Sequence, residues 1–263
     1  MPKITYRKLN FDSKKIDITL ESYQHLRNTN LLERDLLESE IHDLLLNSWG
    51  SFPANFVRMH ILESEKMILA RIDKKCVALC NMNIRNVLGF KIHYIEFLLV
   101  SKEYQKRGIG TLLSFLIIKN EIIKNILYLL VGKSLEIFFI TPNIRVLVHT
   151  AKLASFIYPN PYLSDSVGKI PMADDVTWDL ANELLKNSDN PSRRLEREGL
   201  VLKGSYTGTP WLIYNNDNAP WHTDGKINTF VRKYLGYHSG EDREFMVRAR
   251  INIISLFRYL FNK

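Results

Sequence analysis

A basic pair and two glycines stand together in residues 105–110, QKRGIG, which fit the pattern QxxGxG. The segment follows an apolar run, HYIEFLLV, and precedes a second apolar stretch with helical spacing. Glycines allow backbone N–H groups to approach a ligand closely, and the N-terminus of a helix favours an anion. Lys106 and Arg107 add positive charge beside these N–H groups. The segment therefore predicts a pyrophosphate-binding loop between a strand and a helix.

Two better-known phosphate loops do not fit this segment. A nucleoside-triphosphate loop would end in GKS or GKT, and residues 105–110 have no such ending. A dinucleotide-binding fold would add a third glycine and a ribose-binding acid, and neither stands at the expected distance. A plain strand-to-helix turn without a ligand remains the alternative.

The order of strand, LxV segment, QxxGxG loop and helix in IEFLLVSKEYQKRGIGTLL resembles the GNAT superfamily of N-acetyltransferases. The later run FFITPNIRVLVHTAKL is similar to the next strand and helix of that family, with Asn143 where an asparagine is frequent. The resemblance covers roughly residues 60 to 160. It implies an α/β (α+β) fold with a mixed, mostly antiparallel central sheet flanked by helices and an extended C-terminal part.

The same resemblance implies acetyl-CoA, or another acyl-CoA, as co-substrate. The loop would hold the pyrophosphate, and the backbone of the preceding strand would hold the pantetheine and polarise the thioester carbonyl. An amine would then attack that carbonyl directly, with backbone N–H groups stabilising the oxyanion. The cofactor contacts implied in this way are Leu98, Leu99, Val100, Gln105, Lys106, Arg107, Gly108, Ile109, Gly110, Thr111 and Asn143.

Glu96 is the candidate general base, because an amine must lose a proton before it attacks. It is a lone carboxylate in an apolar strand, and alternation places it on the same face as Leu98 and Val100. Burial in such a strand would raise the pKa of the carboxyl toward that of a useful base. The alternative is a structural glutamate paired with an arginine or capping a neighbouring strand. His93, in the same strand, is expected at the rim of the site.

Tyr158 is the candidate general acid for the leaving thiolate. Many GNAT members place a tyrosine two turns into the second helix, where this chain has His149 and Thr150 instead. Tyr158 follows that helix, from which its hydroxyl would reach back to the thiol. The alternatives are a packed aromatic with one hydroxyl hydrogen bond, or no dedicated acid.

The elements that must position these residues follow from the hydrophobic pattern. A short strand is expected near residues 4–7 and a helix at about 32–47. The runs KMILARI, CVALCNMNIR and KIHYIEFLLV predict an antiparallel meander. A helix ending at about residue 124, a buried strand in SLEIFFIT and a helix over about 143–154 follow the meander.

The C-terminal pattern is weaker. DDVTWDLANELLKNS predicts a helix, and REFMVRARINIISLF predicts a strand that continues into a helix. Short strands and long loops are expected in SRRLEREGLVLKG and PWLIYNNDNAPWHTDG. Residues 1–165 are interpreted as an acyl-CoA-binding core, and residues 166–263 as the part that completes the sheet and the acceptor site.

Metal and disulfide chemistry is not expected. Cys76 and Cys80 are the only cysteines, and in a strand they would lie about 13 Å apart, too far for a disulfide. His222, Asp224 and His238 match an iron site only in part, and the chain lacks the run of strands of the barrel that carries such sites. Three tryptophans would cover core edges or line a pocket for a cationic amine: Trp178, Trp211 and Trp221.

The combined hypothesis is a cytoplasmic N-acetyltransferase that acts on an amine of a small molecule or peptide. A non-catalytic acyl-CoA-binding or sensing module is the alternative. The net charge of +8 lies mainly in residues 1–165 and suits a phosphate-bearing ligand, whereas nucleic-acid binding lacks a supporting motif. No membrane partner is expected, because TLLSFLIIKNEIIKNILYLLV is interrupted by polar residues. A homodimer is left open.

Overall fold

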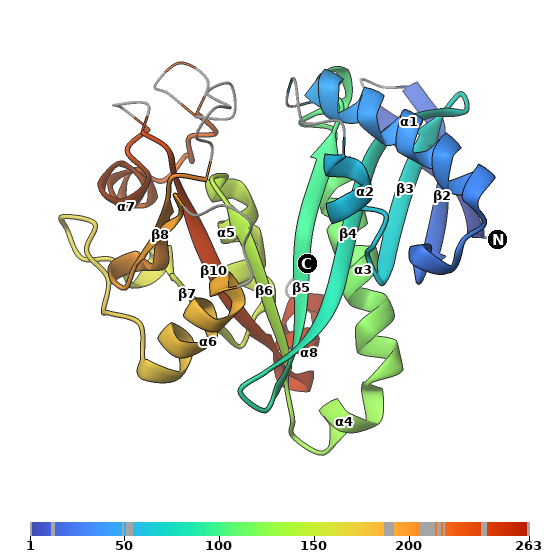
Figure 1. The fold of residues 1–263 in the computed structure, drawn as a ribbon. Coiled ribbons are helices and arrows are strands. Elements are labelled where there is room, and N and C mark those ends of the chain that lie inside the picture. Colours follow the sequence, from blue (N-terminus) through green and yellow to red (C-terminus); the bar gives the residue numbers. More distant parts are fainter. Residues whose placement is uncertain are drawn as a thin grey trace. The chain divides into compact units, whose positions relative to one another are not determined.

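The computed structural model describes residues 2–11, 14–48, 50, 55–186, 192–205, 214, 217, 219–237 and 241–261. The chain forms two compact units, whose elements are labelled in Figure 1. The first unit holds Met1–Ile84 and Tyr94–Asn125, and the second holds Arg85–His93 and Ile126–Lys263. The functional division expected at residue 165 differs from this one and stays a prediction.

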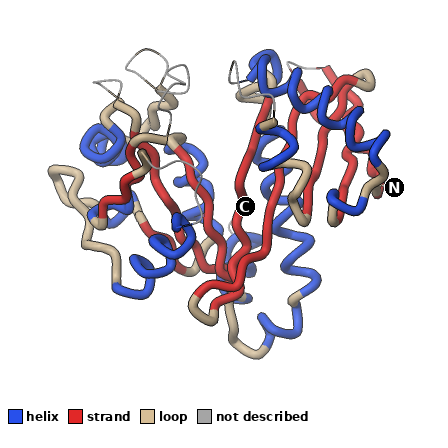
Figure 2. Tube along the Cα trace, in the orientation of Figure 1, coloured by secondary structure: helices blue, strands red, loops and turns tan. Residues whose placement is uncertain are grey.

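An antiparallel sheet forms the centre of the first unit (Figure 2). Its strands, in spatial order, are β1 (Lys3–Phe11), β2 (Lys14–Gln24), β3 (Lys66–Ile72), β4 (Lys75–Val87) and β5 (Phe90–Val100). The register sets Leu20 of β2 opposite Ala70 of β3, and Met67 of β3 opposite Asn81 of β4. The end of β4, the start of β5 and the turn between them, Arg85–His93, belong to the second unit.

Two helices cover one face of this sheet. They are α1 (Leu31–Ser48) and α2 (Phe56–His60), and a short 3-10 turn, η1 (Leu26–Asn28), precedes them. Apolar residues at helical spacing in α1 pack with Met67 and Leu69 of β3 and Leu99 of β5. The helix residues of this core are Leu37, Ile41, Leu44, Leu45 and Val57. The odd-numbered positions of β3 therefore face α1 and α2.

The opposite face of the sheet packs on α3 (Ile109–Lys124). Lys66, at an even-numbered position of β3, forms a buried ion pair with Glu121 of α3. Burial lowers the pKa of Lys66 from its ordinary value, and the nearby Lys124 acts in the same direction. Successive β3 residues thus point into two different layers.

In the second unit, antiparallel strands pair around β10 (Arg243–Ile251). This strand pairs with β6 (Leu135–Thr141), β7 (Phe156–Tyr158) and β9 (Val201–Lys203), and β9 pairs with β8 (Arg194–Glu196). Its helices are α4 (Ile126–Leu130), α5 (Ile144–Leu153), α6 (Asp175–Lys186), α7 (Gly225–Leu235) and α8 (Ile253–Phe261). Two 3-10 turns complete the unit: η3 (Pro161–Leu163) lies between β7 and α6, and η4 (Glu198–Leu200) lies between β8 and β9.

A buried ion pair links two of these strands. Arg248 of β10 donates to both carboxylate oxygens of Glu136 in β6, at 2.9 and 3.2 Å, and to Thr177 Oγ1 in α6 at 2.9 Å. Since the guanidinium has partners on two elements, its desolvation is offset by charge-assisted hydrogen bonds. The pair ties α6 to the sheet.

The expected fold class is confirmed: each unit contains antiparallel strands flanked by helices. The helix at residues 32–47, the three runs of the meander, the helix after the QxxGxG loop and the buried strand SLEIFFIT all form. The final strand and helix, β10 and α8, are also as expected. Within the described residues, no helix is both long enough and apolar enough to cross a membrane.

Several elements were not predicted, among them α2, α4 and β7. The sequence predicts one short strand in the first 24 residues, whereas β1 and β2 form a long hairpin there. The alternation in β2 is carried by Ile16, Ile18 and Leu20, with the polar residues Asp17 and Thr19 between them. Helix α7, GKINTFVRKYL, begins within a stretch interpreted as loops, and Asp224 caps it.

Candidate functional site

The QxxGxG segment is an exposed loop between β5 and α3 in the first unit. After β5 ends at Val100, a 3-10 turn, η2 (Lys102–Tyr104), leads to two left-handed residues, Lys106 at φ 62° and Gly108 at φ 80°. A Cβ added at Gly108 would meet no atom within 4 Å. Glycine is therefore favoured at 108 by the left-handed backbone conformation, and not by lack of space.

At Gly110, by contrast, glycine is favoured because there is little space for a side chain. A Cβ at this position would lie 3.4 Å from Cγ2 of Val100 and 3.6 Å from Cδ2 of Leu98. The first turn of α3 is thus packed against the side chains of the even-numbered positions of β5. Glu96 is half-buried and shares this face by alternation. The structure therefore brings the candidate base, the strand segment and the loop onto one side of the sheet, as the sequence predicts.

Hydrogen bonds hold the ends of the loop. Gln105 donates from Nε2 to the carbonyl oxygen of Val100 at 3.0 Å, and the N–H of Ser101 donates to Val77 of β4 at 2.9 Å. Ser114 Oγ donates to the carbonyl of Gly110 at 2.6 Å. The loop therefore starts from a fixed strand end and returns to a fixed helix start.

The N-terminus of α3 fits an anionic ligand. Gly108, at the N-cap, has no side chain to cap the helix, and the first-turn N–H groups have no carbonyl partner within the helix. Ile109 is buried, whereas the residues on either side are open to solvent: Gln105, Lys106, Arg107, Gly108 and Thr111. Arg107 lies with its guanidinium carbon 5.6 Å from the ring centre of Tyr104. The first-turn N–H groups, the helix dipole and the charges of Lys106 and Arg107 thus lie together at one surface.

Leu99 occupies a different place from its neighbours. Its side chain belongs to the core under α1 and α2, so only its backbone can contact a ligand. Leu98 and Val100, on the other face, are half-buried. The three residues remain predictions as cofactor contacts.

Asn81 is a positioning residue that the sequence reasoning missed. It is fully buried in β4, and its Oδ1 accepts the backbone N–H of Phe97 at 2.9 Å. Its Nδ2 donates to Ser64 Oγ at 2.6 Å and to the carbonyl of His60 at 3.3 Å. The amide thus fixes the peptide that joins Glu96 to Phe97. An asparagine inside the apolar run CVALCNMNIR was the available signal.

The two cysteines lack the character of nucleophiles. Cys76 and Cys80 are buried in β4, and burial raises the pKa of each thiol to about 12. A thiol with such a pKa is protonated at neutral pH and reacts poorly. Direct attack by an acceptor on the thioester needs no thiol of the protein.

Tyr158, in the second unit, has a fully used hydroxyl. It donates to the carbonyl of Pro171 at 3.0 Å and accepts the N–H of Gly199 at 3.1 Å. Burial is the largest cause that raises the pKa of this phenol, to about 12. The arrangement favours the packed aromatic that the sequence leaves as the alternative. The role of Tyr158 as an acid stays a prediction.

Asn143 caps α5. Its Oδ1 accepts the N–H of Arg145 at 3.0 Å, and its own N–H donates to Thr141 Oγ1 at 3.0 Å. Its contact with a cofactor stays a prediction. The rim position expected for His93 is wrong, because the side chain is buried with Nδ1 3.2 Å from the carbonyl oxygen of Glu136.

The remaining sequence candidates have structural partners. Asp224 is the N-cap of α7, and its backbone N–H donates to His222 Nδ1 at 3.0 Å. No group of three metal-ligating side chains exists in the part of the chain that the structure describes. Trp178 and Trp221 lie 5.9 and 5.2 Å from the guanidinium carbons of Arg197 and Arg232. Both His238 and Trp211 are outside the described residues.

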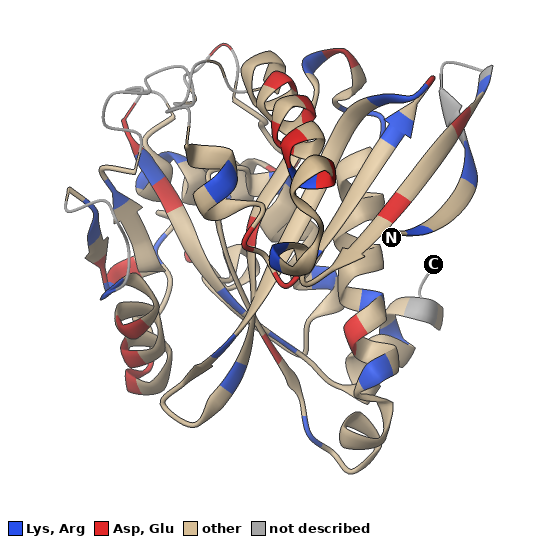
Figure 3. Cartoon of the chain, turned by 45° about the vertical axis from the view of Figure 1, so that its right-hand side comes forward, with Lys and Arg blue, Asp and Glu red and all other residues tan. Residues whose placement is uncertain are grey.

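Several acidic residues of α1 (Figure 3) have ion-pair partners within the first unit. Arg58 pairs with Asp35 at 3.1 Å and with Glu38, and Arg71 pairs with Glu40 at 2.6 Å. Their negative charge is therefore partly neutralised by the unit's own arginines. It does not by itself mark a site for a cationic acceptor.

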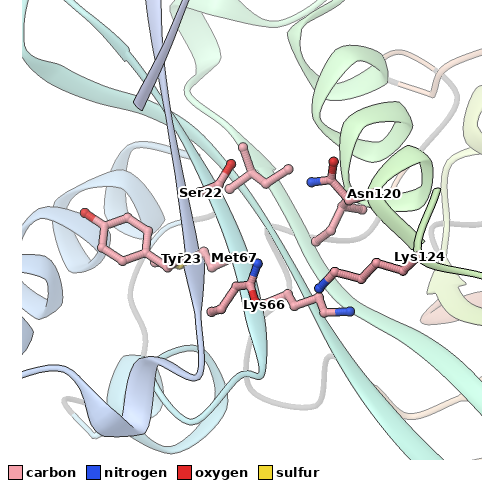
Figure 4. Close-up of a pocket in the computed structure, with 9 residues that line it drawn as sticks. Ser22, Tyr23, Lys66, Met67, Asn120 and Lys124 are labelled. Carbon is pink, nitrogen blue, oxygen red and sulfur yellow. The ribbon is translucent and has the colours of Figure 1, made fainter. Parts of the chain in front are cut away.

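A small hollow lies between β2, β3 and α3 (Figure 4). Its lining is Ser22, Tyr23, Gln24, Lys66, Met67, Ile68, Ile117, Asn120 and Lys124. Although Lys66 supplies an amine there, that amine is ion-paired with Glu121. The hollow is lined by none of the residues of the QxxGxG loop.

Residues 30–121 match the acetyltransferase (GNAT) family, which confirms the resemblance found in the sequence. A comparison with curated proteins found no match. Solved structures similar to this chain include a ribosomal-protein-alanine N-acetyltransferase from Brucella melitensis biovar Abortus 2308, 19% identical over 39% of this chain and 69% of that chain, with a TM-score of 0.29.

Two further structures show comparable similarity. A GNAT-family acetyltransferase from Streptococcus pneumoniae is 21% identical over 39% of this chain and 67% of that chain, with a TM-score of 0.30. An aminoglycoside N-acetyltransferase in complex with CoA is 14% identical over 43% of this chain and 75% of that chain, with a TM-score of 0.32.

Proposed function

Because residues 30–121 belong to the GNAT acetyltransferase family, we propose that the chain is an N-acyltransferase. It transfers an acetyl group, or another acyl group, from acyl-CoA to an amine of a small molecule or peptide. The observation that carries the proposal is the uncapped start of α3 at left-handed Gly108, packed through Gly110 against Leu98 and Val100. A fold alone would not be enough, since one fold serves many functions.

The donor-binding part of the proposal uses backbone groups of the loop. The pyrophosphate would be held by the first-turn N–H groups of α3, with Lys106 and Arg107 adding charge-assisted contacts. Gln105 already donates to Val100, so it would hold the loop in place and leave the phosphate contacts to its neighbours. The backbone of residues 98–100 would orient the donor.

The proposed chemical step consists of two proton transfers and the transfer of the acyl group from sulfur to nitrogen. When bound, the acyl-CoA supplies an electrophilic thioester carbon and a thiolate leaving group. Glu96 would accept a proton from the acceptor ammonium, directly or through water, so that the free amine attacks. A C–N bond then forms, the C–S bond breaks, and the thiolate gains a proton. We keep Tyr158 as the proposed donor of that proton, with water as the alternative because its hydroxyl already donates to Pro171.

In this proposal, residues 166–263 complete the acceptor site and so determine which amine binds. A non-catalytic acyl-CoA-binding module remains the second candidate, because the second helix has His149 and Thr150 where the family has a tyrosine. The two candidates share the donor site and differ only in turnover.

The test measures binding and turnover separately. Acetyl-CoA binding is followed by isothermal titration calorimetry, and free thiol is followed with a panel of amines, in wild type and in Glu96→Gln. Glu103→Gln is the matched control, because Glu103 is exposed and pairs with Lys75 at 3.1 Å. The enzyme hypothesis predicts that Glu96→Gln binds acetyl-CoA but loses at least about tenfold in rate, within the range for one general base.

Three results would speak against the proposal in different ways. Tight binding of acetyl-CoA without turnover on any amine would favour the module. Turnover that is unchanged in Glu96→Gln would remove the glutamate from the mechanism. Failure of the wild type to bind acetyl-CoA would remove both candidates.

A further inference from the structure

The apolar sequence TLLSFLIIKNEIIKNILYLLV divides into two helices with different surroundings. Its second part forms α4, which can be found near the lower edge of Figure 1. In α4 one residue, Leu129, is fully buried. Its neighbours are open to solvent, with exposed fractions of 76% at Leu127, 60% at Leu130 and 71% at Val131. Apolar residues exposed side by side in this way are typical of an interaction surface.

This exposure belongs to a defined, capped turn. Gly132 follows α4 in the left-handed region at φ 81°, and its N–H donates to the carbonyl of Leu129 at 3.1 Å. The N–H of Lys133 donates to the carbonyl of Tyr128 at 3.3 Å. These two bonds are those of a Schellman motif, which ends a helix at a fixed residue. The apolar side chains are thus held outward by a closed backbone.

The charged residues next to α4 along the chain have one sign. Residues 122–135 contain Lys124 and Lys133 but no aspartate or glutamate. The nearest carboxylates along the chain, Glu121 and Glu136, are buried and ion-paired, with Lys66 and Arg248 respectively. These apolar residues, with lysines and no exposed acids beside them in the sequence, are complementary to a bilayer that has an apolar interior and a negative surface.

Tyr128 adds a third feature. It is 45% exposed, and the amine of Lys133 lies 5.2 Å from the centre of its ring. Tyrosine and lysine side chains place an apolar body beneath a polar end, so both suit the boundary between water and hydrocarbon. Leucine and valine beside them suit the layer beneath.

From these observations we propose that the surface formed by Ile126, Leu127, Tyr128, Leu130, Val131 and Lys133 docks on an anionic phospholipid bilayer. The contact is peripheral and reversible, because a surface of this size inserts only a few side chains and does not span. It departs from the expectation of no membrane partner, which the sequence supports only against a spanning helix. The lysine is attracted to the negative surface potential, and this attraction weakens as salt screens it. The proposal is independent of acyl transfer.

The experiment is co-sedimentation of the full chain with sucrose-loaded vesicles. Vesicles of phosphatidylcholine with phosphatidylglycerol are compared with vesicles of phosphatidylcholine alone. The expected result is several-fold more protein bound to the anionic vesicles, falling in 0.5 M NaCl to the level seen without phosphatidylglycerol. No binding of the wild type to either vesicle would overturn the proposal.

Two double variants localise the contact. Leu127→Ser with Val131→Ser should lower the bound fraction at least about fivefold, since it removes the apolar part of the contact. The matched control is Leu31→Ser with Leu32→Ser in α1, which are 76% and 74% exposed but lie beside acidic residues. The control should bind as the wild type does. Equal loss in both double variants would overturn the assignment to α4.

A second copy of the chain is the competing occupant. Size-exclusion chromatography with light scattering measures the mass of the wild type and of the α4 double variant. A wild-type dimer that becomes a monomer in this variant, without preference for anionic vesicles, would assign the surface to self-association and overturn the proposal. Circular dichroism spectra that match between the wild type and the variants show that the fold is retained.

Discussion

Helices α3 and α5 each follow a sheet strand, yet they begin in opposite ways. Asn143 caps α5 by accepting the N–H of Arg145. Gly108 begins α3 in a left-handed conformation and supplies no capping side chain. A side-chain cap satisfies one of the free N–H groups of the first turn, whereas an uncapped start leaves them for solvent or a ligand. A strand-to-helix connection can therefore stabilise the helix when its cap residue has a capping side chain, as at Asn143, or leave N–H groups for a ligand when the cap is a glycine, as at Gly108.

The largest effect is expected where α3 meets β5. Gly110→Val would push a branched side chain into Val100 and Leu98, which already lie 3.4 and 3.6 Å from a Cβ at this position. Overpacking of this kind costs about 1–3 kcal/mol in the free energy of unfolding. Urea denaturation measures the loss, and calorimetry should show weaker acetyl-CoA binding. Gly110→Ala, which adds only the Cβ, should lose less on both measurements; equal losses would contradict the packing argument.

Tyr158 tests whether the region after α5 is structural. Tyr158→Phe would leave the N–H of Gly199 without its acceptor, at a cost of about 2 kcal/mol in the free energy of unfolding. If the residue only packs, the turnover rate per folded molecule should be unchanged. A rate that falls while stability is retained would instead support the role as an acid.

The pH dependence of stability gives a second check on Tyr158. Its pKa is raised from 10.0 to about 12 in the folded chain. Since the folded state holds this proton more tightly, the contribution is present below pH 10 and is lost as the pH rises through about 12. The difference in stability between the wild type and Tyr158→Phe should therefore shrink over that interval. A constant difference would contradict the buried phenol.

Gly108 tests the open helix start directly. Gly108→Asp would place a carboxylate where the proposed pyrophosphate binds, so acetyl-CoA affinity should fall at least about tenfold, or about 1.4 kcal/mol. Gly108→Asn is the control, because asparagine tolerates the left-handed conformation and is neutral. Binding by the aspartate variant that equals binding by the asparagine variant would contradict an anion site at this helix.

The smallest effect is expected at the capped helix. Asn143→Ala removes the acceptor for the N–H of Arg145 and should cost about 1 kcal/mol in the free energy of unfolding. Asn143→Asp keeps an acceptor and should restore most of the stability. If Asn143 only caps, acetyl-CoA binding should follow the stability of the variants. Weaker binding by the stable aspartate variant would support the cofactor contact implied by the resemblance.

The sequence predicts best where pattern and chemistry agree. Strand β5 is continuous and apolar, the glycine loop follows at once, and α3 has regular helical spacing. These local signals were enough to predict the elements and the shared face of Glu96 and Leu98. Strand β2 was missed because its apolar alternation is short, with Ile16, Ile18 and Leu20 in an otherwise polar segment.

Contacts between residues far apart in the chain could not be predicted from the sequence pattern. Asn81 and Phe97 are 16 residues apart, and Tyr158 and Gly199 are 41 residues apart. Composition and periodicity give no partner for a buried amide or phenol, because any donor or acceptor elsewhere in the chain would satisfy it. The two hydrogen-bonded sites therefore became visible only in the structure.

The buried amide of Asn81 has a consequence for how the first unit melts. One side chain connects three segments of the chain: β4, which carries it, β5 through Phe97, and the end of α2 with the turn after it through His60 and Ser64. No segment can leave without stranding a polar group in the core. We therefore expect the Phe97 amide proton to exchange with deuterium only when the whole unit opens, so that β5 frays last and not first.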